Sequence, residues 1–388
     1  MKKSDNSCAI KQIPFGRPIL GEEEKLAVLE VLDGHVLTHG PKCKKFEEIF
    51  ADYIGVKHAI TTSSCTTALH LSLLGLGVGA GDEVIVPAET HVATAHSVEH
   101  VGARPIFVDV QRETGNINPN LIERAITERT KAITVVHYLG LPCDMKAILP
   151  IAERYGVAVV EDCALALGAQ YGRDAVGSMG VTGCFSFYPS KHITTMEGGM
   201  LTTDDDAIAS RVRKQRAFGY DQGYGQRNVP GIYDIVMLGY NFRMSEVQAA
   251  LGVVQMSRLS DFLKVRHQNT KILLERFQEI DLVTTFPIVQ DSARSSCYCV
   301  NVMLPDTDGY IREEVVARLN EVGIGTSVHY PVALPLSTYY QQRYDCRPTD
   351  FPIARWISEK TISLPIGPHL TGDHMLYIAD KLTSILKM

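Results

Sequence analysis

Four short apolar runs, separated by helix-like segments, limit the folds open to this chain more than any other feature. They start about 22 to 27 residues apart and are EVIVP (83–87), PIFVDV (105–110), AITVVH (132–137) and VAVVED (157–162). Near-continuous apolar strands that alternate with helices are typical of a mainly parallel sheet with helices on both faces. We therefore expect an α/β fold whose ligands bind beyond the carboxyl ends of the strands.

The length of the chain favours two domains, because 388 residues exceed the usual size of a single hydrophobic core. A long amphipathic stretch, from about residue 246 to 280, predicts a helix that bridges two domains or forms an interface. The strands and helices expected over 281–388 form a smaller α+β unit. We therefore expect a large domain over residues 1–250, with an N-terminal segment free to pack against the small domain. The linking helix and the small domain would occupy residues 251–388.

Charge and composition argue against several classes of function. The net charge is −6 and no basic stripe or run is present, which disfavours a nucleic-acid binder. No apolar stretch approaches 18 residues and the first 16 residues lack a signal-peptide core, so we expect a cytoplasmic protein without a membrane span. The nine cysteines are scattered and complete no zinc pattern, so we expect reduced thiols and no metal site.

Two charged side chains follow predicted strands and suggest a cofactor. Lys191 lies in FSFYPSKHITTMEGG (185–199), and Asp162 ends the run VAVVED. Such a lysine can form a Schiff base with pyridoxal 5′-phosphate (PLP), and such a carboxylate can keep the pyridine nitrogen protonated. Taken singly, the lysine would be a surface group and the aspartate a helix N-cap, but the pair favours PLP. His192 either assists the lysine or serves in packing.

Small hydroxyl residues run straight into a predicted helix in TTSSCTTALHLSLLGL (61–76) and could hold a phosphate. The backbone amides of Cys65 and Thr66, and the Thr66 hydroxyl, would be donors at the helix N-terminus. Ser186 could complete this cradle, although an ordinary serine or threonine cap is the common alternative. His91 comes just after a strand end, where its ring could stack on a pyridine; a lone histidine is more often simply accommodated.

Together these segments resemble the DegT/StrS-type sugar aminotransferases, which are PLP enzymes of the aspartate aminotransferase fold (fold type I). The resemblance covers nearly the whole chain in the family's order, and the lysine block and the GYNFRMSE block are its most specific parts. The segments that carry it include IPFGRP (13–18), LTHGPKCKKFEE (37–48), EDCALALGA (161–169), FSFYPSKHITTMEGG (185–199), LGYNFRMSEVQAALG (238–252) and VGIGTSVHYP (322–331).

The resemblance implies a role for each candidate residue. Lys191 would form the Schiff base and move a proton between substrate and cofactor, while the cofactor cycles through pyridoxamine phosphate. Asp162 would pair with the pyridine nitrogen, and His91 would take the stacking place that an aromatic residue usually holds.

The phosphate would be bound by residues from two subunits. The resemblance places Thr66, the Cys65 amide and Ser186 on the phosphate within one chain. Asn241, in GYNFRM, would reach the phosphate of the neighbouring subunit's cofactor. We therefore expect a homodimer with shared active sites.

The sequence indicates the residues that contact the substrate less clearly than those that bind the cofactor. Arg243, His329 and His192 are the candidates, with a structural ion pair or strand packing as the alternatives for the first two. Residues 218–235 are rich in glycine, tyrosine and proline and are expected to form a mobile loop near the site. Leu165 stands where family members commonly carry glutamine or histidine against the ring hydroxyl, which makes a non-standard substrate more plausible.

The function implied by the resemblance is transfer of an amino group, with glutamate as expected donor, to a keto group of a nucleotide-linked deoxysugar. The product would serve surface polysaccharides such as lipopolysaccharide O-antigen, or glycosylated metabolites. A keto-cyclitol aminotransferase of the same family is the first alternative. A PLP-dependent sugar dehydratase is disfavoured, because histidine replaces the lysine there. A catalytically silent regulatory homologue is disfavoured by Lys191 and Asp162. The sugar, nucleotide and ring position stay open.

Overall fold

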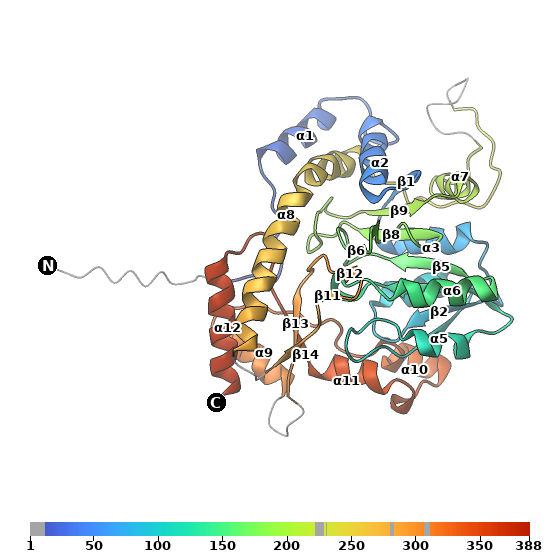
Figure 1. Cartoon of the computed structure of the whole chain (residues 1–388). Coiled ribbons are helices and arrows are strands. Elements are labelled where there is room, and N and C mark those ends of the chain that lie inside the picture. Colours follow the sequence, from blue (N-terminus) through green and yellow to red (C-terminus); the bar gives the residue numbers. More distant parts are fainter. Residues whose placement is uncertain (1–11, 222–228, 230, 280–282, 306–310) are drawn as a thin grey trace.

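A computed structural model describes residues 12–221, 229, 231–279, 283–305 and 311–388 of the chain (Figure 1). A central sheet carries helices on its faces, and a long helix runs from it to a second, smaller group of strands and helices. The fold is therefore the mixed α/β arrangement that the sequence predicts.

The central sheet has seven strands, and the predicted parallel arrangement is confirmed. Strand β9 alone runs antiparallel to its neighbours, whereas the other described pairs in this sheet are parallel. In order across the sheet, the strands are β1 (His58–Thr62), β9 (Gly199–Thr203), β8 (Thr182–Ser186), β5 (Ala158–Asp162), β4 (Thr130–Val136), β2 (Glu83–Pro87) and β3 (Arg104–Val108).

Helices bury both faces of this sheet. Val84 and Val86 of β2 pack into one hydrophobic core, whereas Ile85 between them packs into another. Because side chains alternate across a strand, two buried faces require a near-continuous apolar sequence, as EVIVP shows. The helices are α2 (Pro41–Ile54), α3 (Cys65–Gly75), α4 (Val92–His100), α5 (Pro119–Ala125), α6 (Met145–Tyr155) and α7 (Asp206–Gln215).

The predicted long helix is α8 (Glu246–Gln278), and its start is fixed by a capping box. The Ser245 hydroxyl accepts from the Gln248 amide, and the Gln248 side chain accepts from the Ser245 amide. Figure 1 shows α8 leading from the large sheet to the second unit, where it lies beside α12 (Gly372–Leu386).

The second unit is a three-stranded antiparallel sheet with helices. Its strand order is β10 (Thr284–Thr285), β13 (Val300–Met303), β14 (Thr361–Leu364), and α9 (Arg312–Glu321) packs with α12 beside it. Ile13 is fully buried in this core, so the N-terminal segment packs here. We propose the domain boundary at residues 250 and 251. The core that Ile13 shares with residues of the 273–386 range supports this division, whereas Leu334 and Tyr340 pack into a core of the large sheet.

Smaller elements join the two parts. A four-stranded sheet pairs β12 of the second part with β6 of the first, in the order β11, β12, β6, β7. The remaining elements are α1 (Glu22–Leu32), β6 (Gln170–Tyr171), β7 (Asp174–Ala175), β11 (Val289–Gln290), β12 (Ala293–Arg294), α10 (Thr338–Tyr344) and α11 (Pro352–Lys360).

The described cysteines are free thiols; Cys8 lies outside the described residues. In the described part of the chain, no helix combines the length and the apolar character that crossing a membrane requires.

A buried carboxyl also links the two parts. Glu89, which follows β2, is 1% exposed and accepts hydrogen bonds from the Tyr330 amide (2.9 Å) and the Ser358 hydroxyl (2.8 Å). Burial raises the pKa of Glu89 to about 8, against an ordinary value of 4.5.

Stability should therefore depend on pH through Glu89. Because the folded protein holds this proton more tightly, the free energy of unfolding should fall as pH rises from 4.5 to about 8. The slope is at most about 1.4 kcal/mol for each pH unit. Glu89→Gln should remove this contribution and be more stable than the wild type above that window. Denaturant titrations at pH 5 and pH 9, with the exposed change Glu359→Gln as control, measure the difference; identical pH profiles would contradict it.

Candidate active site

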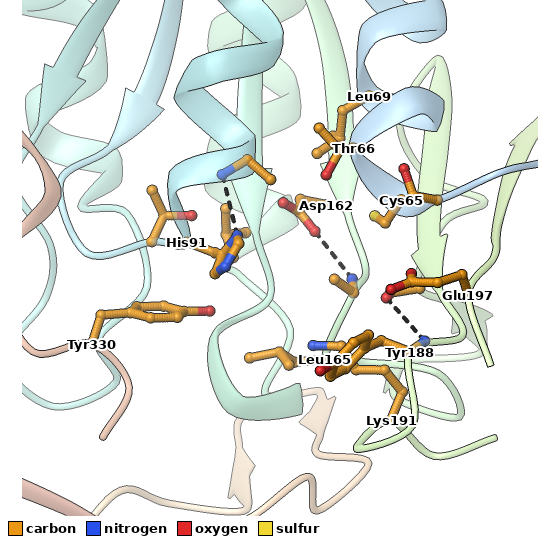
Figure 2. A pocket seen from close by; sticks show the side chains of 16 residues that line it. Cys65, Thr66, Leu69, His91, Asp162, Leu165, Tyr188, Lys191, Glu197 and Tyr330 are labelled. Atoms are coloured by element: carbon orange, nitrogen blue, oxygen red, sulfur yellow. Dashed lines mark hydrogen bonds between the residues drawn. The ribbon is translucent and has the colours of Figure 1, made fainter. Parts of the chain in front are cut away.

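One pocket at the carboxyl ends of the parallel strands gathers most of the predicted site residues. Figure 2 shows their side chains arranged around a shared space, which encloses about 260 Å³. The predicted residues that line it are Cys65, Thr66, His91, Asp162, Ser186 and Lys191. They come from four separate segments of the chain, so the topology of the sheet brings them together.

Asp162 is held in one orientation at the end of β5. Its Oδ1 accepts from the Ala164 amide (3.1 Å), as an N-cap would, and its Oδ2 accepts from the Thr94 hydroxyl (2.9 Å). The Thr90 hydroxyl lies 2.7 Å from that of Thr94 and extends the chain of hydrogen bonds. Each carboxylate oxygen keeps a lone pair that can accept from a ring nitrogen.

The neighbouring Glu161 points to the opposite side of β5 and serves the fold. Its carboxylate accepts from the Gly177, Met179 and Gly180 amides and lies 3.0 Å from His137 Nε2. With Cys163 nearby, this group has the residue types of a metal site, but the carboxylate and His137 are already occupied by hydrogen bonds to protein groups. We therefore assign it a structural role.

Lys191 lies in a turn that follows β8, where its amide donates to the Tyr188 carbonyl. Its Nζ is 5.3 Å from the centre of the Tyr298 ring. Burial lowers the pKa of Lys191, an effect that Cys65 and Asp162 oppose. A lower pKa increases the fraction of neutral amine, the form that can attack a carbonyl.

His192 does not line the pocket. It is 3% exposed, and its Nε2 donates to the Ser296 carbonyl at 3.2 Å. Burial lowers its pKa well below the usual value, so it is a neutral, packed side chain. This geometry favours the packing interpretation over assistance to Lys191.

The N-terminus of α3 forms one wall of the pocket. Ser64 is the N-cap: its hydroxyl accepts from the Thr67 amide (3.2 Å), and its amide donates to the Thr67 hydroxyl (3.1 Å). Cys65 and Thr66 then open the helix, where backbone amides have no carbonyl partner within the helix. Such a terminus favours an anion such as a phosphate.

Gly199 of β9 packs directly against this helix start. A Cβ there would lie 2.4 Å from the carbonyl carbon and oxygen of Ser64 and 2.6 Å from the Cys65 nitrogen. All three contacts are far too short, so only glycine allows the strand and the helix start to approach in this way.

Gly199→Ala should therefore displace the helix start and weaken cofactor binding. We expect a loss of about 1–3 kcal/mol in the free energy of unfolding and an affinity for PLP about tenfold lower or worse. Titration of the apoprotein with PLP, followed by absorbance, measures the affinity. Gly79→Ala is the matched control, because the nearest atom to its new Cβ is 4.0 Å away. Equal affinities in the two variants would argue against this account.

His91 caps α4 as well as lining the pocket. Its Nδ1 accepts from the Ala93 amide at 3.2 Å (Figure 2), so the ring proton is on Nε2. Burial lowers the pKa of His91, which favours this neutral form. His91 and Asp162 thus each accept a hydrogen bond from the backbone amide two residues later and also line the pocket.

The structure places Tyr330, rather than the predicted His329, in the pocket lining. His329 lies behind it with Nδ1 2.8 Å from the Ser363 hydroxyl, and burial lowers its pKa to about 3. Figure 2 shows the Tyr330 ring near His91, with 5.8 Å between the ring centres. Leu165 also lines the pocket and is 3% exposed.

Sequence reasoning missed four other residues that contribute to the site. Thr94 contacts Asp162, and Thr90, Tyr188 and Glu197 line the pocket. Thr90 and Thr94 lie four residues apart on either side of the first residue of α4, and this pair of hydroxyls was the one available signal.

Asn241 and Arg243 do not line the pocket of their own chain. Asn241 is exposed, and its Oδ1 accepts from Arg243 Nε at 2.9 Å. The Arg243 guanidinium also lies 4.8 Å from the centre of the Phe218 ring. Of the loop predicted over 218–235, residues 222–228 and 230 lie outside the described residues.

Comparison with known proteins decides the family. Residues 18–383 match the model of the DegT/DnrJ/EryC1/StrS aminotransferase family. The chain belongs to this family. As a DegT-type sugar aminotransferase it is an enzyme that depends on PLP, as the sequence predicts.

Three relatives illustrate the match. The spore coat polysaccharide biosynthesis protein SpsC of Bacillus subtilis is 38% identical over 380 residues, covering 97% of each chain. Spr1654 of Streptococcus pneumoniae, described as a sugar aminotransferase and solved in its pyridoxamine phosphate form, has a TM-score of 0.91 and 30% identity, covering 97% of this chain and 99% of its own. The GDP-4-keto-6-deoxymannose-3-dehydratase ColD, with bound GDP-perosamine, has a TM-score of 0.88 and 27% identity, covering 95% and 99%.

Proposed function

We propose that this DegT-type enzyme transfers an amino group from glutamate to a keto group of a nucleotide-linked deoxysugar. The observation that carries the proposal is the joint placement of Lys191 and Asp162 in one pocket with a helix N-terminus. SpsC acts in polysaccharide biosynthesis, which supports a product destined for a surface polysaccharide such as lipopolysaccharide O-antigen, or for a glycosylated metabolite.

The pocket fits PLP by the chemistry of its donors. It offers an amine, a buried carboxylate and uncapped backbone amides, which match the aldehyde, the ring nitrogen and the phosphate. When bound, PLP supplies an electron sink for the bonds at the substrate's amine-bearing carbon. Lys191 then holds and moves the proton between substrate and cofactor, and Asp162 keeps the positive charge on the ring nitrogen.

The other lining residues position the cofactor. The Cys65 and Thr66 amides and the Ser186 hydroxyl would hold the phosphate, and the His91 ring would stack on the pyridine face. Leu165 cannot hydrogen-bond a ring hydroxyl, so it would only pack against the cofactor. That difference supports an acceptor outside the commonest substrates of the family.

The proposed active unit is a homodimer in which Asn241 and Arg243 reach the partner's pocket. Large apolar side chains are exposed on α1, between α1 and α2, and on the segment before α8, where an interface would bury them. Those on the described residues include Leu26, Leu29, Leu32, Val36, Leu37, Ile232, Ile235, Val236 and Leu238.

Dimerisation can be tested at Leu238, which is 77% exposed. Leu238→Asp should shift sedimentation from twice 42.8 kDa to the single-chain mass and abolish activity, because a charge would be buried in the interface. Ile311→Asp changes an apolar side chain that is 55% exposed on the second part and should stay dimeric. A wild type that sediments as an active single chain would overturn the proposal.

The acceptor is tested with defined keto substrates. The purified enzyme, loaded with PLP, is incubated with glutamate and either a nucleotide-linked keto-deoxysugar or a keto-inositol, and products are identified by mass. We expect amination of the nucleotide sugar. Amination of the keto-inositol alone would establish the cyclitol alternative instead.

A dehydratase would release water from the sugar, and its product mass would show this loss. ColD has the same fold, but Lys191 argues against this reaction here. A silent regulatory homologue would give no product; the intact pocket argues against that outcome.

A further inference from the structure

Lys191 lines a second, small cavity in addition to the cofactor pocket. Its polar lining consists of the basic side chains Arg17, Lys191, Arg266 and His369 and the hydroxyls of Ser190 and Tyr298. No carboxylate lines it among the described residues. A cavity with this concentration of positive charge and hydroxyl donors is built for an anion.

Arg266 of α8 supplies the buried charge. It is 5% exposed, and its Nη1 donates to the carbonyls of Tyr298 (2.8 Å) and Cys297 (3.4 Å). Its Nε is buried and finds no hydrogen-bonding partner in the described part of the chain. Among the described residues the Arg266 guanidinium hydrogen-bonds only to neutral carbonyls, and burying a charge without a counterion is costly.

His369 supplies a second buried atom without a partner. Its Nε2 donates to the Pro14 carbonyl at 2.9 Å, whereas its Nδ1 has no hydrogen bond to any described residue. Gly367 makes the arrangement possible: a Cβ there would lie 2.6 to 2.7 Å from the His369 ring and 3.9 Å from Arg266 Nη2. Buried polar atoms of this kind normally face a bound partner.

We propose that this cavity binds a small monovalent anion, a carboxylate or a halide, between Arg266 and His369. The guanidinium offers N–H donors that suit a carboxylate, and the exposed Arg17 adds a second charge at the cavity. A carboxylate could come from the amino donor and a halide from solution. The amino donor as a source of the anion rests on the proposed transamination, whereas the anion site itself does not.

The anion should bind more tightly as pH falls. Burial first, and the charges of Arg266, Arg17 and His374, keep the pKa of His369 low without an anion. Lys191 adds a further charge at the cavity. An anion would offset these charges and let His369 take up a proton, so that Nδ1–H becomes a donor to it.

Two measurements on the PLP-loaded enzyme test the site. Crystals soaked in sodium bromide should show an anomalous bromide peak between Arg266 and His369. In solution, the chloride-35 resonance should broaden on binding and narrow again when acetate competes. Narrowing by glutamate as well would identify the donor carboxylate as an occupant; narrowing by acetate alone would support the site for free ions.

Variants separate the site from nonspecific ion binding. Arg266→Met should abolish the broadening, and Arg17→Gln, a change at an exposed residue, should weaken halide binding about tenfold. Arg294→Gln, an exposed arginine on β12, is the matched control and should bind as the wild type does. The proposal would be overturned if the crystals showed no bromide peak and the chloride-35 resonance broadened equally in Arg17→Gln and the wild type. The cavity would then hold only water. An enzyme that binds bromide but aminates no sugar would refute the proposed function and leave the site standing.

Discussion

Lys191→Ala should reduce the rate of transamination by at least about 10⁴-fold while leaving the fold intact. Lys191 is the only amine among the described residues that line the pocket, so its loss removes both the nucleophile and the proton carrier. The truncated side chain lines the pocket rather than a hydrophobic core, so the structural cost should be small. Circular dichroism and thermal unfolding check the fold, and single-turnover kinetics with glutamate measure the rate.

Two further variants sharpen this test. Lys271→Ala removes a lysine on α8 whose side chain is 73% exposed, and it should keep full activity. Lys191→Arg keeps the charge but offers no primary amine, so it should be as inactive as the alanine variant. A Lys191→Ala enzyme that retains a tenth of the wild-type rate would show that another group carries the proton.

Asp162→Asn should lower the rate by about 10³-fold with little change in geometry. A carboxylate about 4 Å from a pyridinium contributes roughly 4 kcal/mol at an effective dielectric constant of 20, which corresponds to this factor. Asparagine can still accept from the Ala164 amide and meet the Thr94 hydroxyl, so the pocket should keep its shape. Rates with glutamate give the effect.

A chemical rescue distinguishes lost charge from lost structure. N-methylated PLP carries a permanent positive charge on the ring nitrogen and should recover part of the Asp162→Asn activity. Asp206→Asn, at a side chain that is 80% exposed, should behave as wild type with either cofactor. Failure of the methylated cofactor to help, together with a lowered thermal stability, would point to a structural role for Asp162.

The sequence predicted the large sheet because both of its faces are buried. Val84 and Val86 of EVIVP belong to one core and Ile85 to another, so every position after Glu83 is apolar and the run is easy to recognise. The same topology explains why Lys191 and Asp162 meet, since strands β5 and β8 are parallel neighbours that end at one edge. The long helix α8 was predicted to within two residues of its end, because its amphipathic pattern is uninterrupted.

Other parts of the site depend on tertiary packing, which cannot be predicted from the pattern of neighbouring residues in the sequence. His329 and Tyr330 are adjacent, and only the path of the backbone decides that Tyr330 lines the pocket. Arg266 and His369 are about a hundred residues apart, and a buried arginine in an amphipathic helix resembles a surface one in sequence. The role proposed for Asn241 involves a second copy of the chain, which a single sequence does not describe.

The absorbance spectrum of the purified enzyme, before and after glutamate, tests the central claim most directly. We expect a visible band from PLP bound through Lys191, which glutamate converts to the near-ultraviolet band of pyridoxamine phosphate. Lys191→Ala provides the baseline in which the visible band is shifted or lost. A visible band that glutamate leaves unchanged would reject glutamate as donor, and the absence of any band after PLP is added would contradict the account of the site.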